Sequence, residues 1–137
     1  MVDFGATREY SKEFMDNWLH LLQAGAVGDR DACAEWSLKL GYLTGEENEV
    51  SMKSLSFPPI AHMQVFVQIM LDAHIKSMIL LAAPFRSSTP QPVAFGPGTA
   101  WAEATNEIRA LIPVMLKHRL TPPPKETYSL NRCVSRL

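Results

Sequence analysis

The sequence lacks a long apolar run, an excess of charge of one sign and a close pair of cysteines. No stretch of about 18 or more residues is uniformly apolar, so no segment is predicted to span a membrane. The 13 basic and 14 acidic residues give a net charge of −1 and form no block of one sign, which disfavours nucleic-acid binding. Cys33 and Cys133 lie far apart and in no metal-ligand spacing, which favours a reducing compartment.

The chain is long enough for one hydrophobic core but too short for two ordinary domains, because it has only 137 residues. Its first residues have neither the apolar core of a signal peptide nor the Arg-rich, acid-poor character of a transit peptide. We therefore expect one domain, or part of one, and predict no targeting segment within this chain.

The first helical pattern lies between a serine and two glycines. Ser11 can cap the helix, and Gly25 and Gly28 are predicted to end it. Its apolar face consists of Phe14, Trp18, Leu21 and Leu22. A second helix is predicted from the Asp29 cap to Gly41. Its inward residues are Cys33, Trp36 and Leu40. The two helices are expected to form an antiparallel hairpin.

Two further helical patterns fill the middle of the chain. Residues 44–47 read Thr-Gly-Glu-Glu, a capping box in which the threonine and a glutamate each satisfy a free backbone N–H, so a helix should start there. Pro58 and Pro59 must stop it. A stronger pattern runs from near Ile60 to Ala83 and is closed by Pro84. Its predicted inward residues are Phe66, Ile69, Met70, Ala73, Ser77, Leu80 and Leu81.

Proline dominates the last part of the chain. Residues 87–98 are predicted to be irregular, and Thr99 to cap a helix in which Pro113 should cause a kink or a break. The buried face of that helix is predicted to contain Trp101, Thr105, Ile108, Leu111, Ile112 and Met115. Pro122 to Pro124 predict a rigid connector, with an exposed proline-recognition ligand as the alternative. A last helix is expected from about Lys125 toward Arg136.

The predicted fold is all-α, with five to six helices, because no stretch alternates in the way typical of a strand. Within these helices, His74 has no second histidine or cysteine at ligand spacing, so a packed or hydrogen-bonded residue is favoured over a metal ligand. The three tryptophans lie at helical positions without interleaved basic residues, which favours core packing over a base-stacking platform.

One short motif is typical of a catalytic site. In protein kinases, the aspartate of a triplet such as Asp3-Phe4-Gly5 holds Mg²⁺ against the ATP phosphates, because a hard cation prefers carboxylate oxygen. The glycine allows the backbone to turn sharply behind it. A tripeptide also arises by chance, and an ordinary loop is the alternative interpretation.

A longer series of motifs resembles the UbiB family, the aarF-domain atypical protein-kinase-like proteins that support coenzyme Q (ubiquinone) biosynthesis. The blocks occur in the family's order and are spread over most of the chain. They include Val-Asp-Phe-Gly-Ala at residues 2–6, Leu-Gly-Tyr-Leu-Thr-Gly-Glu-Glu-Asn-Glu-Val at 40–50, Met-Leu-Asp-Ala-His-Ile-Lys-Ser-Met at 70–78 and Ala-Pro-Phe-Arg at 83–86. The stretch from Arg109 to Arg132 is the most specific match.

The resemblance implies that residues 1–137 are a partial kinase-like domain, the helical C-terminal lobe from the Asp-Phe-Gly motif onward. By position, Asp3 is similar to the family's Mg²⁺-coordinating aspartate, so Asp3, Phe4 and Gly5 form the implied cofactor site and Asp3 the implied metal ligand. For the full-length family it implies ATP and Mg²⁺ binding and an ATPase or small-molecule kinase activity. It also implies a place at the matrix side of the mitochondrial inner membrane, with coenzyme Q biosynthesis proteins and the membrane surface as partners.

The chain departs from the family pattern in three places. Upstream of the triplet it has no Lys-x-Gly-Gln element, alanine-rich loop, lysine–glutamate ion pair or catalytic-loop aspartate and asparagine, and no residue of the chain is assigned a catalytic role. Residues 51–69 separate Val50 from Met70, which adjoin in the family, so a non-family insertion from a retained intron or mistaken gene model is expected. Residues 133–137 replace a further apolar helix.

Two functions remain open on the sequence alone. Phosphoryl transfer depends on several positioned groups acting together, so we expect this fragment of an atypical kinase to be inactive without its missing N-terminal lobe and to bind ATP weakly or not at all. The alternative is a non-catalytic helical protein-interaction module that docks on partner proteins or membranes. An enzyme needs the upstream lysine and catalytic-loop residues in the same polypeptide, whereas an interaction module does not.

Overall fold

A computed structural model of the chain describes residues 9–44, 61–119 and 122–127, and of residues 61–67 only the backbone. The helical elements in these ranges are α1 (Lys12–Val27), α2 (Arg30–Lys39), α4 (Ala61–Leu81), the 3-10 helix η1 (Ala83–Phe85) and α5 (Ala100–His118). The described ranges are helical in these elements and contain no strand, which confirms the all-α prediction. The helix predicted after Thr44 falls in residues 45–60, outside the described ranges.

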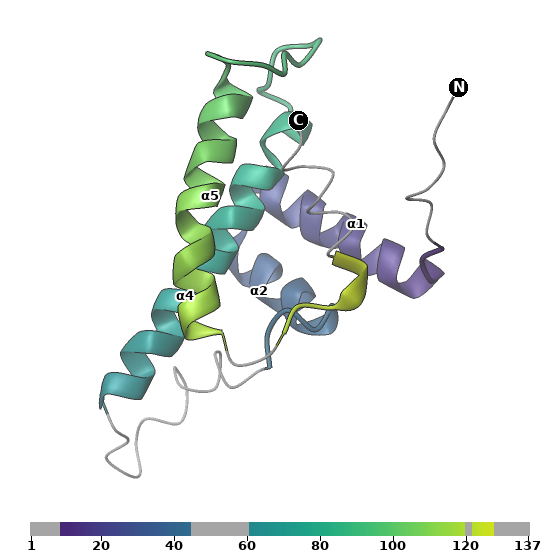
Figure 1. Cartoon of the computed structure of the whole chain (residues 1–137). Coiled ribbons are helices and arrows are strands. Elements are labelled where there is room, and N and C mark those ends of the chain that lie inside the picture. Colours follow the sequence, from purple (N-terminus) through teal and green to yellow (C-terminus); the bar gives the residue numbers. More distant parts are fainter. Residues whose placement is uncertain (1–8, 45–60, 120–121, 128–137) are drawn as a thin grey trace.

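The long helices α4 and α5 form the main pair of the fold. They run antiparallel and side by side, while α1 and α2 lie together on one side of this pair (Figure 1). The ion pair between Lys76 of α4 and Glu107 of α5, at 3.0 Å, lies on the surface of the pair. The hydrophobic core occupies the space where the α1–α2 hairpin meets α4 and the start of α5.

Helix α1 begins as predicted but runs past one of its two predicted ends. The Ser11 hydroxyl accepts a hydrogen bond from the Phe14 N–H at 3.1 Å, and Gly28 ends the helix with φ of +83°. The prediction that Gly25 also ends the helix is wrong. Gly25 is buried against α4, and a Cβ atom there would lie 2.9 Å from the Ala82 Cβ and 3.0 Å from the Met78 carbonyl oxygen. Its missing side chain therefore allows α1 to approach α4 closely.

Helix α2 agrees with its prediction except at one aromatic residue. Asp29 caps it by accepting from the Ala32 N–H at 3.0 Å, and Cys33 and Leu40 are buried. Trp36, predicted to be buried, is only half-buried. Its ring stacks on His20 of α1 with 4.4 Å between ring centroids, while the Lys39 ammonium lies 3.9 Å from the Trp36 centroid. Trp36 therefore joins the two hairpin helices near the surface.

Helix α4 buries more of its circumference than one stripe. Its buried residues are Met70, Leu71, Ala73, His74, Ile75, Ser77, Met78 and Leu81. Ile69 was predicted to face inward but is 39% exposed, and Leu80 is half-buried. Since both the hairpin and α5 pack on α4, its buried positions follow two neighbours and not a single amphipathic face.

Helix α5 continues through its internal proline. Thr99 caps it by accepting from the Ala102 N–H at 3.3 Å, and Trp101 and Thr105 are buried as predicted. The helix runs past Pro113 to His118, so the proline does not break it. Packing along α4 holds the helix together across the missing hydrogen bond. Toward its C-terminal end the predicted buried face opens to solvent, and Ile112 is 41% exposed.

The connections around α5 also agree with the proline pattern. Residues 86–98 form turns and bends without helix, and residues 122–124 are not helical. One helical turn follows at residues 125–127, and its Thr127 side chain is fully buried. The remainder of the predicted last helix lies outside the described ranges.

Candidate functional site

The sequence-predicted cofactor site lies outside the part of the chain that the structure describes. Asp3, Phe4 and Gly5 therefore remain predictions. Among the described residues, no group of three histidine, cysteine, aspartate or glutamate side chains could hold a metal ion. In the same ranges, no helix is long and apolar enough to cross a membrane. The candidate site must be sought among the buried polar side chains.

Four such side chains meet where the end of α2, the middle of α4 and the proline connector come together. Ser37 and Thr127 are fully buried, His74 is 1% exposed and Tyr42 is 3% exposed. We call this set the buried polar cluster. Four polar residues within one small core are unusual, because each needs a hydrogen-bond partner that apolar neighbours cannot supply.

His74 is the centre of the buried polar cluster. Its Nε2 atom shares a hydrogen bond of 2.9 Å with the Ser37 hydroxyl, and its ring centroid lies 5.0 Å from that of Tyr42. Burial, reinforced by the positive charge of Arg119, lowers the pKa of His74 to about 3. The imidazole is therefore neutral near pH 7, and His74 is the packed, hydrogen-bonded helix residue that the sequence predicted.

Tyr42 is the least satisfied member of the cluster. Its hydroxyl makes no hydrogen bond to the described residues. Burial raises its pKa well above the ordinary value, although the nearby Thr127 side chain and Arg119 act in the opposite direction. The Thr127 side chain lies close enough to lower the pKa of Tyr42 as a hydrogen-bonding neighbour, although the Tyr42 hydroxyl does not reach the full geometry of a hydrogen bond. The Thr127 hydroxyl itself donates to the Pro124 carbonyl at 2.6 Å.

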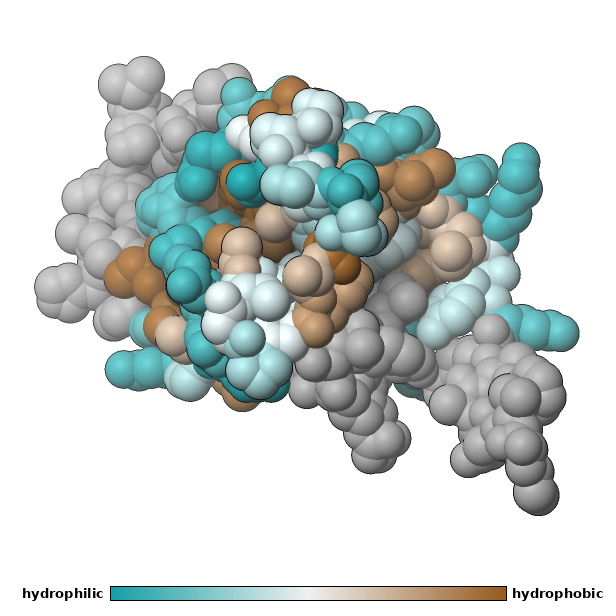
Figure 2. Space-filling model, turned by 90° about the horizontal axis from the view of Figure 1, so that it is seen from above, coloured by the Kyte–Doolittle hydropathy of each residue, from teal (hydrophilic) through white to brown (hydrophobic). Residues whose placement is uncertain are grey.

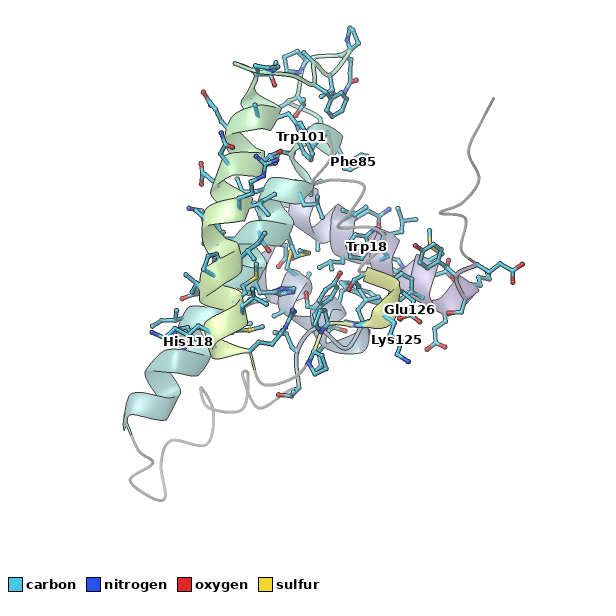
Figure 3. The ribbon with its side chains drawn as sticks, in the orientation of Figure 1. Trp18, Phe85, Trp101, His118, Lys125 and Glu126 are labelled. Atoms are coloured by element: carbon cyan, nitrogen blue, oxygen red, sulfur yellow. The ribbon has the colours of Figure 1, made fainter. Side chains whose placement is uncertain are left out.

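The proline connector covers this cluster from one side. The Thr127 N–H donates to the Pro124 carbonyl at 3.0 Å, which closes a compact turn. The Pro124 Cγ atom lies 3.6 Å from the position that a Cβ atom would take on Gly41, so the turn rests directly on the chain leaving α2. Figure 3 shows Lys125 and Glu126 on this turn, on the side of the molecule where Trp18 of α1 lies.

A second feature is an apolar cavity of about 260 Å³ beside the start of α5. Pro84, Pro90, Val93 and Trp101 are among its lining residues, and none of its lining residues is ionisable. Phe95 packs edge-on against the Trp101 ring with 5.7 Å between centroids. The surface seen in Figure 2 carries apolar side chains in separate small areas among hydrophilic ones. The cavity could hold an apolar group, but its lining has no ionisable side chain for catalysis.

Cys33, the one cysteine among the described residues, is also expected to be unreactive. Cys33 is fully buried, and burial raises the pKa of its thiol to about 11, with the charge of Asp29 adding to the effect and that of Arg30 opposing it. A thiol with such a pKa is protonated near pH 7 and is a poor nucleophile.

Three members of the cluster escaped the sequence predictions. Ser37 lies four residues after Cys33, so the helical periodicity of α2 could have placed it on the buried face. Tyr42 and Thr127 belong to no periodic pattern. Tyr42 reaches His74 from the turn that ends α2, where its N–H donates to the Ser37 carbonyl, and Thr127 lies on the connector after α5.

Comparison with known proteins identifies relatives over nearly the whole chain. No protein-family model matches it. The chain is 38% identical to the atypical kinase COQ8B, mitochondrial, of Rattus norvegicus over 96% of the chain and 20% of that protein. It is 38% identical to the atypical kinase COQ8, mitochondrial, of Schizosaccharomyces pombe over 98% of the chain and 18% of that protein. With the atypical kinase coq-8, mitochondrial, of Caenorhabditis elegans it shares 35% identity over 98% of the chain and 15% of that protein.

The chain thus spans about a fifth or less of the length of these relatives. The matches extend from one end of the chain to nearly the other, and they agree with the motifs that the sequence shares with one family. Over nearly its whole length the chain is therefore similar to a segment of these atypical kinases, which confirms its resemblance to the UbiB family.

Proposed function

We propose that the chain is the C-terminal-lobe segment of an atypical kinase that supports ubiquinone biosynthesis in the mitochondrion, on the matrix side of the inner membrane. The observation that carries this proposal is the 35–38% identity, over nearly the whole chain, to proteins named atypical kinase COQ8, mitochondrial. An ATPase or small-molecule kinase activity would belong to the longer protein. The coenzyme Q biosynthesis proteins and the membrane surface are its proposed partners.

In this proposal, the cofactor-binding residues of the segment are Asp3, Phe4 and Gly5. The Asp3 carboxylate is the hard oxygen donor that Mg²⁺ prefers, and the ion would neutralise charge on the ATP phosphates when bound. The described residues bring no further cluster of carboxylates to a common point. One carboxylate is a weak Mg²⁺ site, so the isolated chain is proposed to bind Mg-ATP weakly or not at all and to be inactive without an N-terminal lobe.

Residues 51–69 are proposed to be an insertion into the family pattern. Helix α4 starts at Ala61 and is continuous through Met70, so the later part of the proposed insertion extends this helix at its N-terminal end. An extension of a helix lengthens the fold without displacing the buried residues of α4 from Met70 onward.

A chimera tests the proposal directly. The 137 residues would replace the matching segment of the Schizosaccharomyces pombe relative, and the chimera would be expressed in cells that lack that relative. We expect restored ubiquinone content and respiratory growth, measured by quinone extraction and growth on a non-fermentable carbon source. Asp3→Asn should abolish the rescue, because it removes the metal-binding charge.

The matched control is Asp16→Asn, which makes the same chemical change at an exposed position of α1. It should rescue like the unmodified chimera. A second chimera without residues 51–69 separates a harmful insertion from a wrong assignment. If both chimeras accumulate in mitochondria without restoring ubiquinone, or if Asp3→Asn rescues fully, the proposal is wrong.

A non-catalytic interaction module is the second candidate. Exposed apolar side chains favour it, because Phe85 is 66% exposed and Leu116 is 69% exposed. The two candidates differ in their behaviour toward nucleotide. Tight Mg-ATP binding by the purified 137-residue chain, measured by calorimetry, would contradict both the interaction module and the inactivity proposed for the isolated segment.

A further inference from the structure

We propose that the apolar cavity beside the start of α5 binds a small, mainly apolar molecule that carries one carbonyl oxygen, and that the indole N–H of Trp101 donates a hydrogen bond to that oxygen. This inference does not depend on the proposed function. It rests on the size and lining of the cavity, on a buried donor that has no acceptor, and on the bonds that hold the cavity walls in place.

The cavity has room for one ring with a short substituent. Its volume is about 260 Å³. For comparison, an apolar protein cavity of about 150 Å³ can hold a benzene molecule. Alanine, proline and valine supply most of the lining residues. Such side chains offer water no hydrogen bonds, so the cavity favours an occupant that is mainly apolar.

The polar side chains of the lining differ in whether they have a partner. They belong to Thr89, Thr99 and Trp101. The Thr89 hydroxyl donates to the Ala83 carbonyl at 2.6 Å, and the Thr99 hydroxyl donates to the Gly96 carbonyl at 2.8 Å. Trp101 is only 8% exposed, and its Nε1 atom is buried with no hydrogen-bond partner among the described residues. Trp101 therefore brings an unused donor to the edge of the cavity.

The unused donor specifies the kind of ligand atom that it can bind. A buried N–H without an acceptor has lost its bond to water and gained none, so a ligand that supplies an acceptor recovers free energy. The indole N–H can only donate. A carbonyl oxygen meets this need without adding an O–H or N–H that apolar walls would leave unpaired. Because neighbouring atoms cover Nε1 in the structure, these atoms must shift slightly when the oxygen reaches it.

The walls of the cavity are held in place by bonds of the protein itself. The Arg86 guanidinium donates to the Ile79 carbonyl at 2.9 Å, which ties the segment after η1 to α4. The Thr89 N–H donates to the Arg86 carbonyl at 3.0 Å. Phe95 packs edge-on against Trp101, which lies at this end of the molecule (Figure 3). Binding to walls that are already ordered costs little conformational entropy.

An NMR titration of the full 137-residue chain tests this inference. The probe is acetophenone, an aromatic ring that carries one carbonyl group. The matched probe is α-methylstyrene, which has the same shape but a CH₂ group in place of the oxygen. The methyl groups of Val93, a lining residue, report entry into the cavity. We expect both probes to shift these methyl resonances and to give nuclear Overhauser effects to them, and only acetophenone to move the Trp101 Nε1–H resonance downfield.

Trp101→Phe removes the donor and keeps an aromatic ring. We expect the ratio of acetophenone affinity to α-methylstyrene affinity, followed at the Val93 methyl groups, to fall roughly tenfold. The ratio is used because any change in cavity size affects both probes. Trp36→Phe makes the same substitution on α2, where the ring stacks on His20 and not on the cavity. It should leave the ratio unchanged.

Three results would overturn the inference. If neither probe contacts the Val93 methyl groups, the cavity is not a binding site. If acetophenone binds there but moves the Trp101 Nε1–H resonance no more than α-methylstyrene does, the donor takes no part. If Trp101→Phe leaves the affinity ratio as it is in the native chain, or Trp36→Phe lowers it equally, no hydrogen bond to Trp101 selects the ligand. The first two results come from the native chain, so they decide even if Trp101→Phe does not fold.

Discussion

The Nε2 atom of His74 and the hydroxyl oxygen of Ser37 lie 2.9 Å apart, and this hydrogen bond joins α4 to α2 in the interior of the protein. Both residues are buried, so no water can replace the bond if one partner is lost. Ser37→Ala should therefore lower the free energy of unfolding by about 1–3 kcal/mol, measured by urea denaturation. Ser88→Ala, at an exposed loop position, should change it by less than about 0.5 kcal/mol. Equal stability of the two variants would show that the bond contributes nothing.

The same histidine should make the fold sensitive to acid. His74 has a pKa of about 3 in the folded chain and an ordinary value of 6.5, so below pH 6.5 the unfolded chain binds a proton that the folded chain does not. Its stabilisation is complete above pH 6.5 and is lost as the pH falls toward 3, by about 1.4 kcal/mol per pH unit. Urea denaturation at several pH values between 7 and 4 would show this dependence.

His74→Gln separates this effect from that of the carboxylates, which also titrate in acid. Glutamine cannot take up a proton but can still form a hydrogen bond with Ser37. The difference in stability between the native chain and the variant should shrink as the pH falls from 7 to 4. A difference that stays constant would mean that His74 does not account for the acid sensitivity.

Gly25 should be intolerant of even one added methyl group. Alanine favours a helix over glycine by about 1 kcal/mol, but its Cβ atom would lie 2.9 Å from the Ala82 Cβ and 3.0 Å from the Met78 carbonyl oxygen. We expect Gly25→Ala to lower the midpoint of thermal unfolding, because overpacking costs about 1–3 kcal/mol. Adding Ala82→Gly should recover part of the loss. A stabilised single variant would show that α1 can move away from α4 at little cost.

Cys33 should react with thiol reagents only when the chain unfolds. It is fully buried and its pKa is raised to about 11, so both access and ionisation oppose reaction at pH 8. In a Cys133→Ser background, labelling by a maleimide should be slow in buffer and fast in urea. Rapid labelling in buffer would mean that the first part of α2 opens locally around Cys33.

The sequence predicts the helices well because each helix end depends on residues that are close together in the chain. Ser11, Asp29 and Thr99 were recognised as caps, and each accepts a hydrogen bond from the first turn of its helix. Their side chains reach backbone groups only three residues away, so neighbouring residues decide the outcome. The family resemblance was likewise readable, because it depends on the order of residues and not on their contacts.

Predictions were wrong where packing against another helix determines whether a residue is buried or a helix ends. Gly25 was interpreted as a helix end, yet the helix continues because α4 requires a residue without a side chain at that point. Ile69 was placed inside but is 39% exposed, because α4 packs against two partners. Of the kink or break expected at Pro113, the break does not occur, because α5 continues to His118. The proposed metal ligand Asp3 lies outside the described residues, so that prediction stands untested.

The sequence alone determined the all-α class, the caps, the irregular proline segments and the family resemblance, because each follows from residues that are neighbours in the chain or from their order. Only the tertiary structure decided that Ser37, Tyr42, His74 and Thr127 share one interior. These residues are brought together across distances in sequence that no local pattern spans, and the connector after α5 completes the set. The hydrogen-bonding state of each polar group then depends on which segment happens to cover it, and that is a property of packing.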